Sequence, residues 1–81
     1  MNACFLIVKI IEKIEYKFII QSKNKAIVKF KAKLLNGNIV KIKAYDEIAD
    51  KIYRKHNIDD YILINGYLDV NCIQIIAFDK I

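Results

Sequence analysis

The chain has 81 residues, with 14 lysines and arginines against 9 aspartates and glutamates, which gives a formal net charge of +5. This length allows one domain, residues 1–81, whose single core is marginal in size. Hydrophobic residues make up 56% of the chain, more than a small barrel buries alone, which favours a homo-oligomer. The basic balance favours a polyanionic partner such as nucleic acid, although an AT-rich genome also enriches lysine, isoleucine and asparagine.

The two cysteines, Cys4 and Cys72, match neither a CxxC motif nor a zinc-ligand spacing. We expect both to be buried, reduced thiols in a reducing compartment, and we expect no metal or other cofactor. The apolar run at residues 5–8 is broken by Lys9, far short of the ~20 residues of a membrane span. Neither a membrane segment nor a signal peptide is therefore expected.

Strands are predicted from runs of β-branched and aromatic residues and from the alternation of apolar and polar positions. The first strand covers residues 3–13, and a second extended piece covers residues 16–20 after a bend near residues 14–15. Residues 21–25 are predicted to form a polar turn. The clearest alternation in the chain then follows at residues 26–35.

Asn36-Gly37 is a strong hairpin signal, because both central positions of such a turn tolerate positive φ. It joins residues 26–35 to a returning strand at residues 39–45, and each strand has two distinct faces. The inward face is expected to consist of Val28, Phe30, Ala32, Leu34, Val40, Ile42 and Ala44. The outward face is expected to carry Lys29, Lys31, Lys33, Ile39, Lys41, Lys43 and Tyr45.

A helix follows the hairpin, with Asp46 as its expected N-cap. Apolar residues at helical spacing, Tyr53 among them, are expected to face the core. His56 at the helix end is expected to complement the helix dipole or to lie in solvent. Two further strands are predicted at residues 61–70 and 72–78.

The predicted order is three strands, a helix and two strands. This is the order of an OB-fold barrel, an all-β fold of five strands with one helix that plugs the barrel between strands 3 and 4. A ferredoxin-like fold needs a helix between its first two strands, and residues 14–25 lack a helical pattern. An SH3-like barrel lacks the amphipathic helix. The five-stranded OB-fold barrel is therefore the predicted fold class.

Three motifs resemble the bacterial-type single-stranded DNA-binding protein family, and together they span nearly the whole chain. Residues 1–7, MNACFLI, are similar to the family's opening strand, and residues 45–50, YDEIAD, resemble its entry into the helix. Residues 60–68, DYILINGYL, resemble its fourth strand, with Gly66 and Leu68 in place. The opening, the small size and the composition are most similar to the short plastid-encoded branch that also occurs in cyanobacteria.

The chain departs from this family at several positions. Val8, Asp46 and Asp59 stand where the family carries glycine, at Val8 in many of its members. The family's tryptophan platforms are missing, because the chain has no tryptophan. The hairpin at residues 36–38 is short, and the sequence lacks the family's tail with an acidic tip. The grip on nucleic acid is therefore expected to be weaker than in longer relatives.

The resemblance implies a protein that coats single-stranded DNA during replication or repair, with RNA as an alternative ligand. Its expected interface is the outer face of the hairpin, where lysines contact phosphates and an aromatic ring stacks on bases. The predicted nucleic-acid-binding residues are Lys29, Lys31, Lys33, Lys41, Lys43 and Tyr45. Tyr45 occupies the position of a stacking aromatic in the family, while Tyr16, Phe18 and Tyr67 are weaker candidates.

A different interpretation stays open, in which the lysines only solvate the outer sheet face and block edge aggregation. The domain is then an OB-fold assembly or adaptor module that has lost nucleic-acid binding and contacts proteins. An enzyme is not expected, because Asp59-Asp60 alone do not make a catalytic or metal site. The resemblance further implies dimers or tetramers formed through the first strand, located in a plastid (chloroplast) stroma or otherwise in bacterial cytoplasm.

Overall fold

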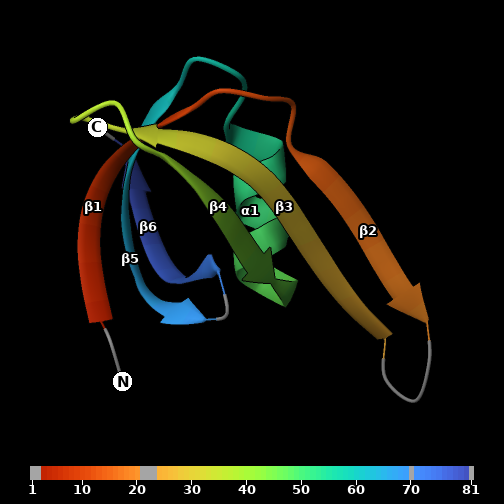
Figure 1. Cartoon of the computed structure of the whole chain (residues 1–81). Coiled ribbons are helices and arrows are strands. Elements are labelled where there is room, and N and C mark those ends of the chain that lie inside the picture. Colours follow the sequence, from red (N-terminus) through yellow and green to blue (C-terminus); the bar gives the residue numbers. More distant parts are fainter. Residues whose placement is uncertain (1–2, 21–23, 70, 81) are drawn as a thin grey trace.

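The computed structural model describes residues 3–20, 24–69 and 71–80 of the chain. The elements in these residues follow the order β1 (Ala3–Ile10), β2 (Glu15–Ile20), β3 (Asn24–Leu34), β4 (Ile39–Tyr45), α1 (Asp46–Lys55), β5 (Tyr61–Asp69) and β6 (Cys72–Lys80). Figure 1 shows the strands curving around a common interior, with α1 behind β3 and β4. The first predicted strand is shorter in the structure, the last is longer, and residue 70 lies outside the described residues.

Five strands close into a barrel. β1 pairs with β5, β5 with β6, β4 with β3 and β3 with β1, all antiparallel. β4 and β6 pair in parallel and complete the ring. The prediction of a mostly β fold with one helix and a five-stranded barrel is thereby confirmed for the described residues.

The position of the helix differs from the prediction. α1 lies between β4 and β5, not between strands 3 and 4, because the bend divides the N-terminal region into two separate strands. At the bend, the backbone N–H of Lys31 donates to Oε1 of Glu12 at 2.9 Å, so a side chain replaces a strand partner there. Among the described strands β2 pairs with β3 alone, and their hairpin projects beyond the ring in Figure 1.

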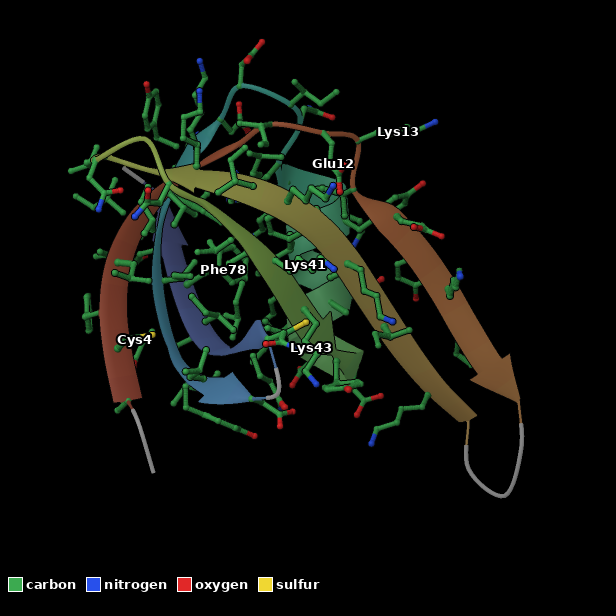
Figure 2. The ribbon with its side chains drawn as sticks, in the orientation of Figure 1. Cys4, Glu12, Lys13, Lys41, Lys43 and Phe78 are labelled. Atoms are coloured by element: carbon green, nitrogen blue, oxygen red, sulfur yellow. The ribbon has the colours of Figure 1, made fainter. Side chains whose placement is uncertain are left out.

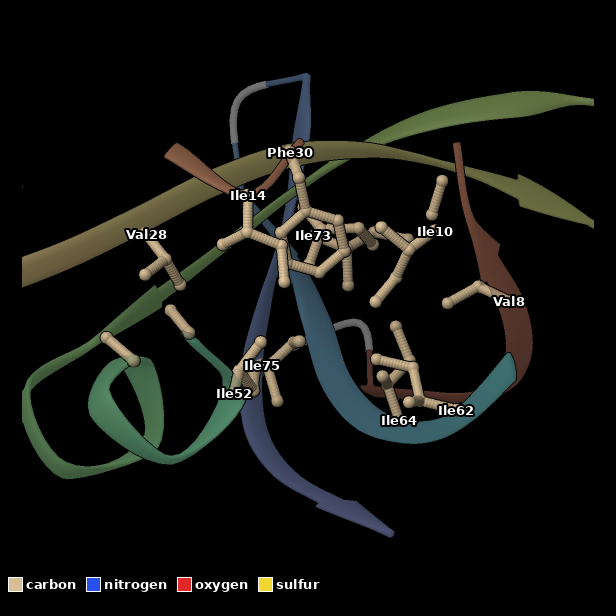
Figure 3. Packing of buried hydrophobic residues seen from close by; sticks show 14 residues of the cluster. Val8, Ile10, Ile14, Val28, Phe30, Ile52, Ile62, Ile64, Ile73 and Ile75 are labelled. Carbon is tan, nitrogen blue, oxygen red and sulfur yellow. The ribbon is translucent and has the colours of Figure 1, made fainter. Parts of the chain in front are cut away.

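The barrel interior is filled mainly by isoleucine, as the close view in Figure 3 shows. The buried cluster consists of Val8, Ile10, Ile14, Val28, Phe30, Ala32, Ile42, Ala44, Ala49, Ile52, Ile62, Ile64, Ile73 and Ile75. The predicted inward face of β3 is confirmed by Val28, Phe30 and Ala32, all at most 2% exposed. Because side chains alternate along a strand, the burial of these three residues forces the lysines between them outward.

The entry into α1 differs from the expectation. Tyr45 is the N-cap residue, and Asp46 is instead the first helical residue, with a positive φ of 53°. Oδ1 of Asp46 accepts a hydrogen bond from the backbone N–H of Ala26 at 3.3 Å. The carboxylate therefore links the helix entry to β3 and does not cap the helix.

The side chain of Tyr53 in α1 is more exposed than expected, and that of His56 at the C-terminal end of α1 is more buried. Tyr53 is 47% exposed, and its ring lies 4.9 Å from that of Tyr16 between centroids. His56 is 5% exposed, and its ring meets Phe78 edge-on with centroids 5.5 Å apart. The histidine is therefore part of the packing between α1 and β6.

Cys4 and Cys72 are free thiols. Both were expected to be buried, but each is only half-buried. In the described ranges, none of the helical structure has the length and apolar character needed to cross a membrane. The same ranges contain no group of three or more histidine, cysteine, aspartate or glutamate residues arranged to hold a metal ion.

Candidate nucleic-acid interface

The outer faces of β3 and β4 carry the five predicted lysines, here called the lysine strip: Lys29, Lys31, Lys33, Lys41 and Lys43. Lys29 lies opposite Lys43 in the β3–β4 ladder, and Lys31 lies opposite Lys41. Figure 2 shows Lys41 and Lys43 one after the other along β4. Like charges directly opposite each other destabilise a sheet. The strip therefore concentrates positive charge at some cost in stability.

The strip continues onto β1, where Lys9 lies opposite Lys33. The Lys9 ammonium is 3.7 Å from Oδ1 of Asp59 and 5.8 Å from the centre of the Tyr61 ring. The Asp59 side chain is 77% exposed, so this ion pair is screened by water and contributes little to stability. Sequence reasoning missed Lys9 as a site residue, because its place beside β3 follows from the closure of the barrel.

Tyr45 stands at the end of the strip, where β4 runs directly into α1. Its ring is half-buried, with Nζ of Lys25 at 4.8 Å and Nζ of Lys43 at 5.8 Å from the ring centre. Both ammonium groups are within the range of a cation–π interaction. Lys25 was not predicted as a site residue because residues 21–25 were assigned to a turn. Lys25 belongs to β3, while residues 21–23 lie outside the described residues.

Lys43 differs from the rest of the strip because an acid holds it. Its Nζ lies 2.6 Å from Oδ2 of Asp69 at the end of β5, and its side chain is only 16% exposed. The hydrogen bond that the Lys43 ammonium donates to Asp69 is the main cause that raises the pKa of Lys43. Within the described part of the chain, the ion pairs involve none of the other four strip lysines.

Carboxylates border the strip on two sides. On the β2 side, Glu15 lies opposite Lys29, and Glu12 at the bend bonds to the backbone of Lys31 (Figure 2). On the β6 side, Asp69 is bound to Lys43. These carboxylates limit the width of the positively charged surface on its β2 and β6 sides.

The weaker aromatic candidates lie at different places. Tyr16 and Phe18 pair with buried residues of β3, so they project from the opposite face of the hairpin to the strip. Tyr67 on β5 pairs with Gln74, the residue that lies beside Lys43 in the parallel pairing of β4 and β6. Of the aromatic candidates, Tyr45 therefore lies next to the lysines, and Tyr67 lies one strand further away, on the other side of β6.

The fold resembles that of two solved structures. The SSB domain of a protein from Synechococcus sp. matches with a TM-score of 0.88 and 14% identity, over 99% of this chain and 96% of that one. A small single-stranded DNA-binding protein from Streptomyces coelicolor matches with a TM-score of 0.70 and 13% identity, over 100% of this chain and 95% of that one. No family model and no curated protein matches the chain. The likeness shows an OB-fold-like barrel, and neither neighbour's name denotes an enzyme.

Proposed function

We propose that the protein binds single-stranded nucleic acid, DNA in the first place, without catalysis, through the lysine strip and Tyr45. The observation that carries the proposal is the register that sets Lys29 opposite Lys43 and Lys31 opposite Lys41. A sheet that needed only a soluble outer face would be more stable with opposite charges across the ladder. A phosphate backbone along the strip neutralises the facing lysines Lys31 and Lys41, and Lys29 beside the acid-bound Lys43, and releases counterions.

Tyr45 supplies the second part of the interaction. A base stacked on its ring contributes about 1–3 kcal/mol, whichever base it is, because every base has a π face. The Lys25 ammonium lies over this ring, 4.8 Å from its centre, so a base that stacks on that side of the ring displaces the ammonium toward the phosphate backbone. Phosphate contact and stacking are common to both nucleic acids, so RNA is the alternative ligand.

The position of the strip in the barrel supports the proposal. OB folds bind oligonucleotides on the face of the second and third barrel strands, which are β3 and β4 in this chain. One of the solved structures that this fold resembles is a small single-stranded DNA-binding protein. A role in replication or repair, in a plastid or a bacterial cytoplasm, stays a prediction from the sequence resemblance.

The test is fluorescence anisotropy with labelled oligo-dT and oligo-U over a series of salt concentrations. We expect micromolar or tighter binding that weakens with salt. In Lys31→Gln/Lys41→Gln, the slope of log affinity against log salt should fall by about 1.4, since each phosphate contact on a single strand contributes about 0.7. The matched control, Lys51→Gln/Lys55→Gln, removes two exposed charges from α1 and should leave the slope unchanged.

A second pair of variants tests the stacking platform. Tyr45→Ala should weaken binding by about 5- to 150-fold, the equivalent of one lost base stack. Tyr45→Phe keeps the ring and should bind like the unmodified protein. Absence of binding at low salt, from a protein whose circular dichroism spectrum shows it folded, would overturn the proposed function.

A second candidate function rests on an exposed apolar face. Phe5 is 66% exposed and Leu35 75% exposed, and together with Ile7 and Leu63 they line a shallow groove beside β1. We propose that a second copy of the chain covers this face in a dimer or tetramer. If the domain is instead an adaptor module, a different protein covers this apolar face. Sedimentation at micromolar concentration tests which partner covers this face, because a second copy gives a dimer or tetramer, whereas a monomer leaves the face for a different protein.

A further inference from the structure

The ion pair of Lys43 and Asp69 spans three neighbouring strands. Lys43 on β4 lies beside Gln74 on β6, and Asp69 on β5 lies opposite Cys72 on β6. Nζ and Oδ2 are 2.6 Å apart, and the two side chains are 16% and 39% exposed. A short charge-assisted bond that is partly shielded from water is stronger than an exposed surface pair. The positive charge of Lys43 is therefore already compensated in the free protein.

This compensation changes what Lys43 offers to a ligand. The ammonium has three N–H donors, and one of them is bonded to Asp69. A phosphate that contacts either of the others comes close to the carboxylate of Asp69, which repels it unless the carboxylate moves away. The other strip lysines require no such movement. Because the same Nζ lies 5.8 Å from the centre of the Tyr45 ring, the repulsion acts beside the proposed stacking platform.

We propose that Asp69 is a built-in competitor that keeps Lys43 from contacting phosphate and thereby lowers the affinity for single-stranded nucleic acid. This inference rests on the proposed function, since it concerns the same surface. In the unmodified protein, the phosphate contacts are then made by Lys29, Lys31, Lys33 and Lys41, while Lys43 stays paired with Asp69.

At the opposite end of the strip, Lys9 is paired with an acid more weakly than Lys43 is. There Lys9 is 3.7 Å from Asp59, whose side chain is 77% exposed. Water and salt screen such a pair, so Lys9 can exchange Asp59 for phosphate at little cost. The competitor effect is therefore specific to Asp69, at the Tyr45 end of the strip.

The experiment compares Asp69→Asn with Asp79→Asn by anisotropy of labelled oligo-dT across a salt series. Both variants change the net charge equally, but Asp79 is exposed near the end of β6, opposite Leu63. Asp69→Asn frees Lys43 for one more phosphate contact, so the slope of log affinity against log salt should steepen by about 0.7. Over the range from 1 M to about 0.05 M salt, this slope corresponds to roughly eightfold tighter binding at the low end.

Two further variants separate this effect from a general change of charge or fold. Lys43→Gln/Asp69→Asn lacks the freed ammonium, so its salt slope should return to that of the unmodified protein. Asp69→Ser, measured in parallel, removes the same charge with a smaller side chain and should steepen the slope as Asp69→Asn does. Circular dichroism shows which of the variants are folded.

The outcomes distinguish this inference from the proposed function. If the unmodified protein binds and Asp69→Asn behaves like Asp79→Asn, the competitor role is wrong and the proposed function stands. If neither the unmodified protein nor the Asp69 variants bind, both are wrong. If only the Asp69 variants bind, the competitor role is supported in its strongest form.

Discussion

A methyl group added at Gly66 has no room between β5 and β6. Gly66 is buried opposite Ile75, directly after the irregularity in the pairing at Asn65. A Cβ atom here would collide with the backbone carbonyl oxygen of Gln74 and lie 3.2 Å from Cγ2 of Ile73. Because the carbonyl belongs to the neighbouring strand and cannot rotate away, the two strands would have to separate.

The expected cost of Gly66→Ala follows from two opposed effects. Overpacking of a well-filled interior costs about 1–3 kcal/mol, whereas the reduced entropy of the unfolded chain offsets about 0.4–1 kcal/mol. A net loss of about 1–2 kcal/mol is a large part of the stability of a small domain. Since each kcal/mol shifts the Tm of such a domain by about 4–8 °C, we expect Tm to fall by about 4–16 °C.

Thermal unfolding followed by circular dichroism measures this shift. Protein concentrations must be matched, because the Tm of an oligomer depends on concentration. Gly37→Asn is the control: Gly37 has a φ of 92° and no atom would lie within 4 Å of an added Cβ, and asparagine tolerates positive φ. Its stability should change by no more than about 0.5 kcal/mol. If the Tm of Gly66→Ala equals that of this control, the close approach of β5 and β6 is refuted.

Three further predictions follow from other parts of the molecule. The Asn57 backbone N–H, 3.1 Å from Oδ2 of Asp60, lowers the pKa of this carboxyl, and His56 contributes to a smaller extent. Because the folded pKa lies below the ordinary 3.8, the stabilisation is present above that pH and is lost as the pH falls through the folded pKa. Urea midpoints of Asp60→Asn should thus lie below those of the unmodified protein near neutrality and converge with them in acid, and parallel curves would contradict this. Asp59 has a φ of 77°, so Asp59→Gly should raise Tm by a few degrees, and a lower Tm would show that its side chain matters more than its backbone strain. Since Phe5 lies in the face that we propose a second copy covers, Phe5→Glu should leave the fold intact and convert the proposed dimer or tetramer to a monomer in sedimentation, whereas an unchanged oligomer would place the subunit interface elsewhere.

The outward lysines were predictable from the sequence because strand alternation is a local signal. Lys29, Lys31 and Lys33 are each separated by one apolar residue, and a shift by one position would bury all three. The place of the hairpin turn was predictable from the Asn-Gly pair, although of the two residues Gly37 alone has a positive φ. Both strands and both faces of the β3–β4 hairpin are confirmed by the register.

The remaining features depend on which strands become neighbours. Lys43 and Asp69 are 26 positions apart and meet only because β4 pairs with β6 in parallel and β6 with β5. Such a pairing leaves no periodic trace in either strand. The bend near residues 14–15 was predicted from the sequence, but the long-range hydrogen bond at this bend, from the Lys31 backbone N–H to Oε1 of Glu12, was not. Sequence reasoning therefore predicted the outward charges of the candidate interface but missed the acids and lysines that surround them.

The helix entry shows how a departure from the resembled family can serve the proposed site. Asp46 stands where that family has glycine, yet its φ of 53° keeps the conformation that glycine favours. Its side chain also does what glycine cannot, because Oδ1 accepts the N–H of Ala26, the neighbour of Lys25. This hydrogen bond links the strand–helix junction, which carries Tyr45, to Ala26. The neighbour of Ala26 in the chain is Lys25, whose ammonium lies over the Tyr45 ring. A platform whose backbone is held in this way has less freedom to lose on binding, which favours a tyrosine in the role that tryptophan has in the resembled family.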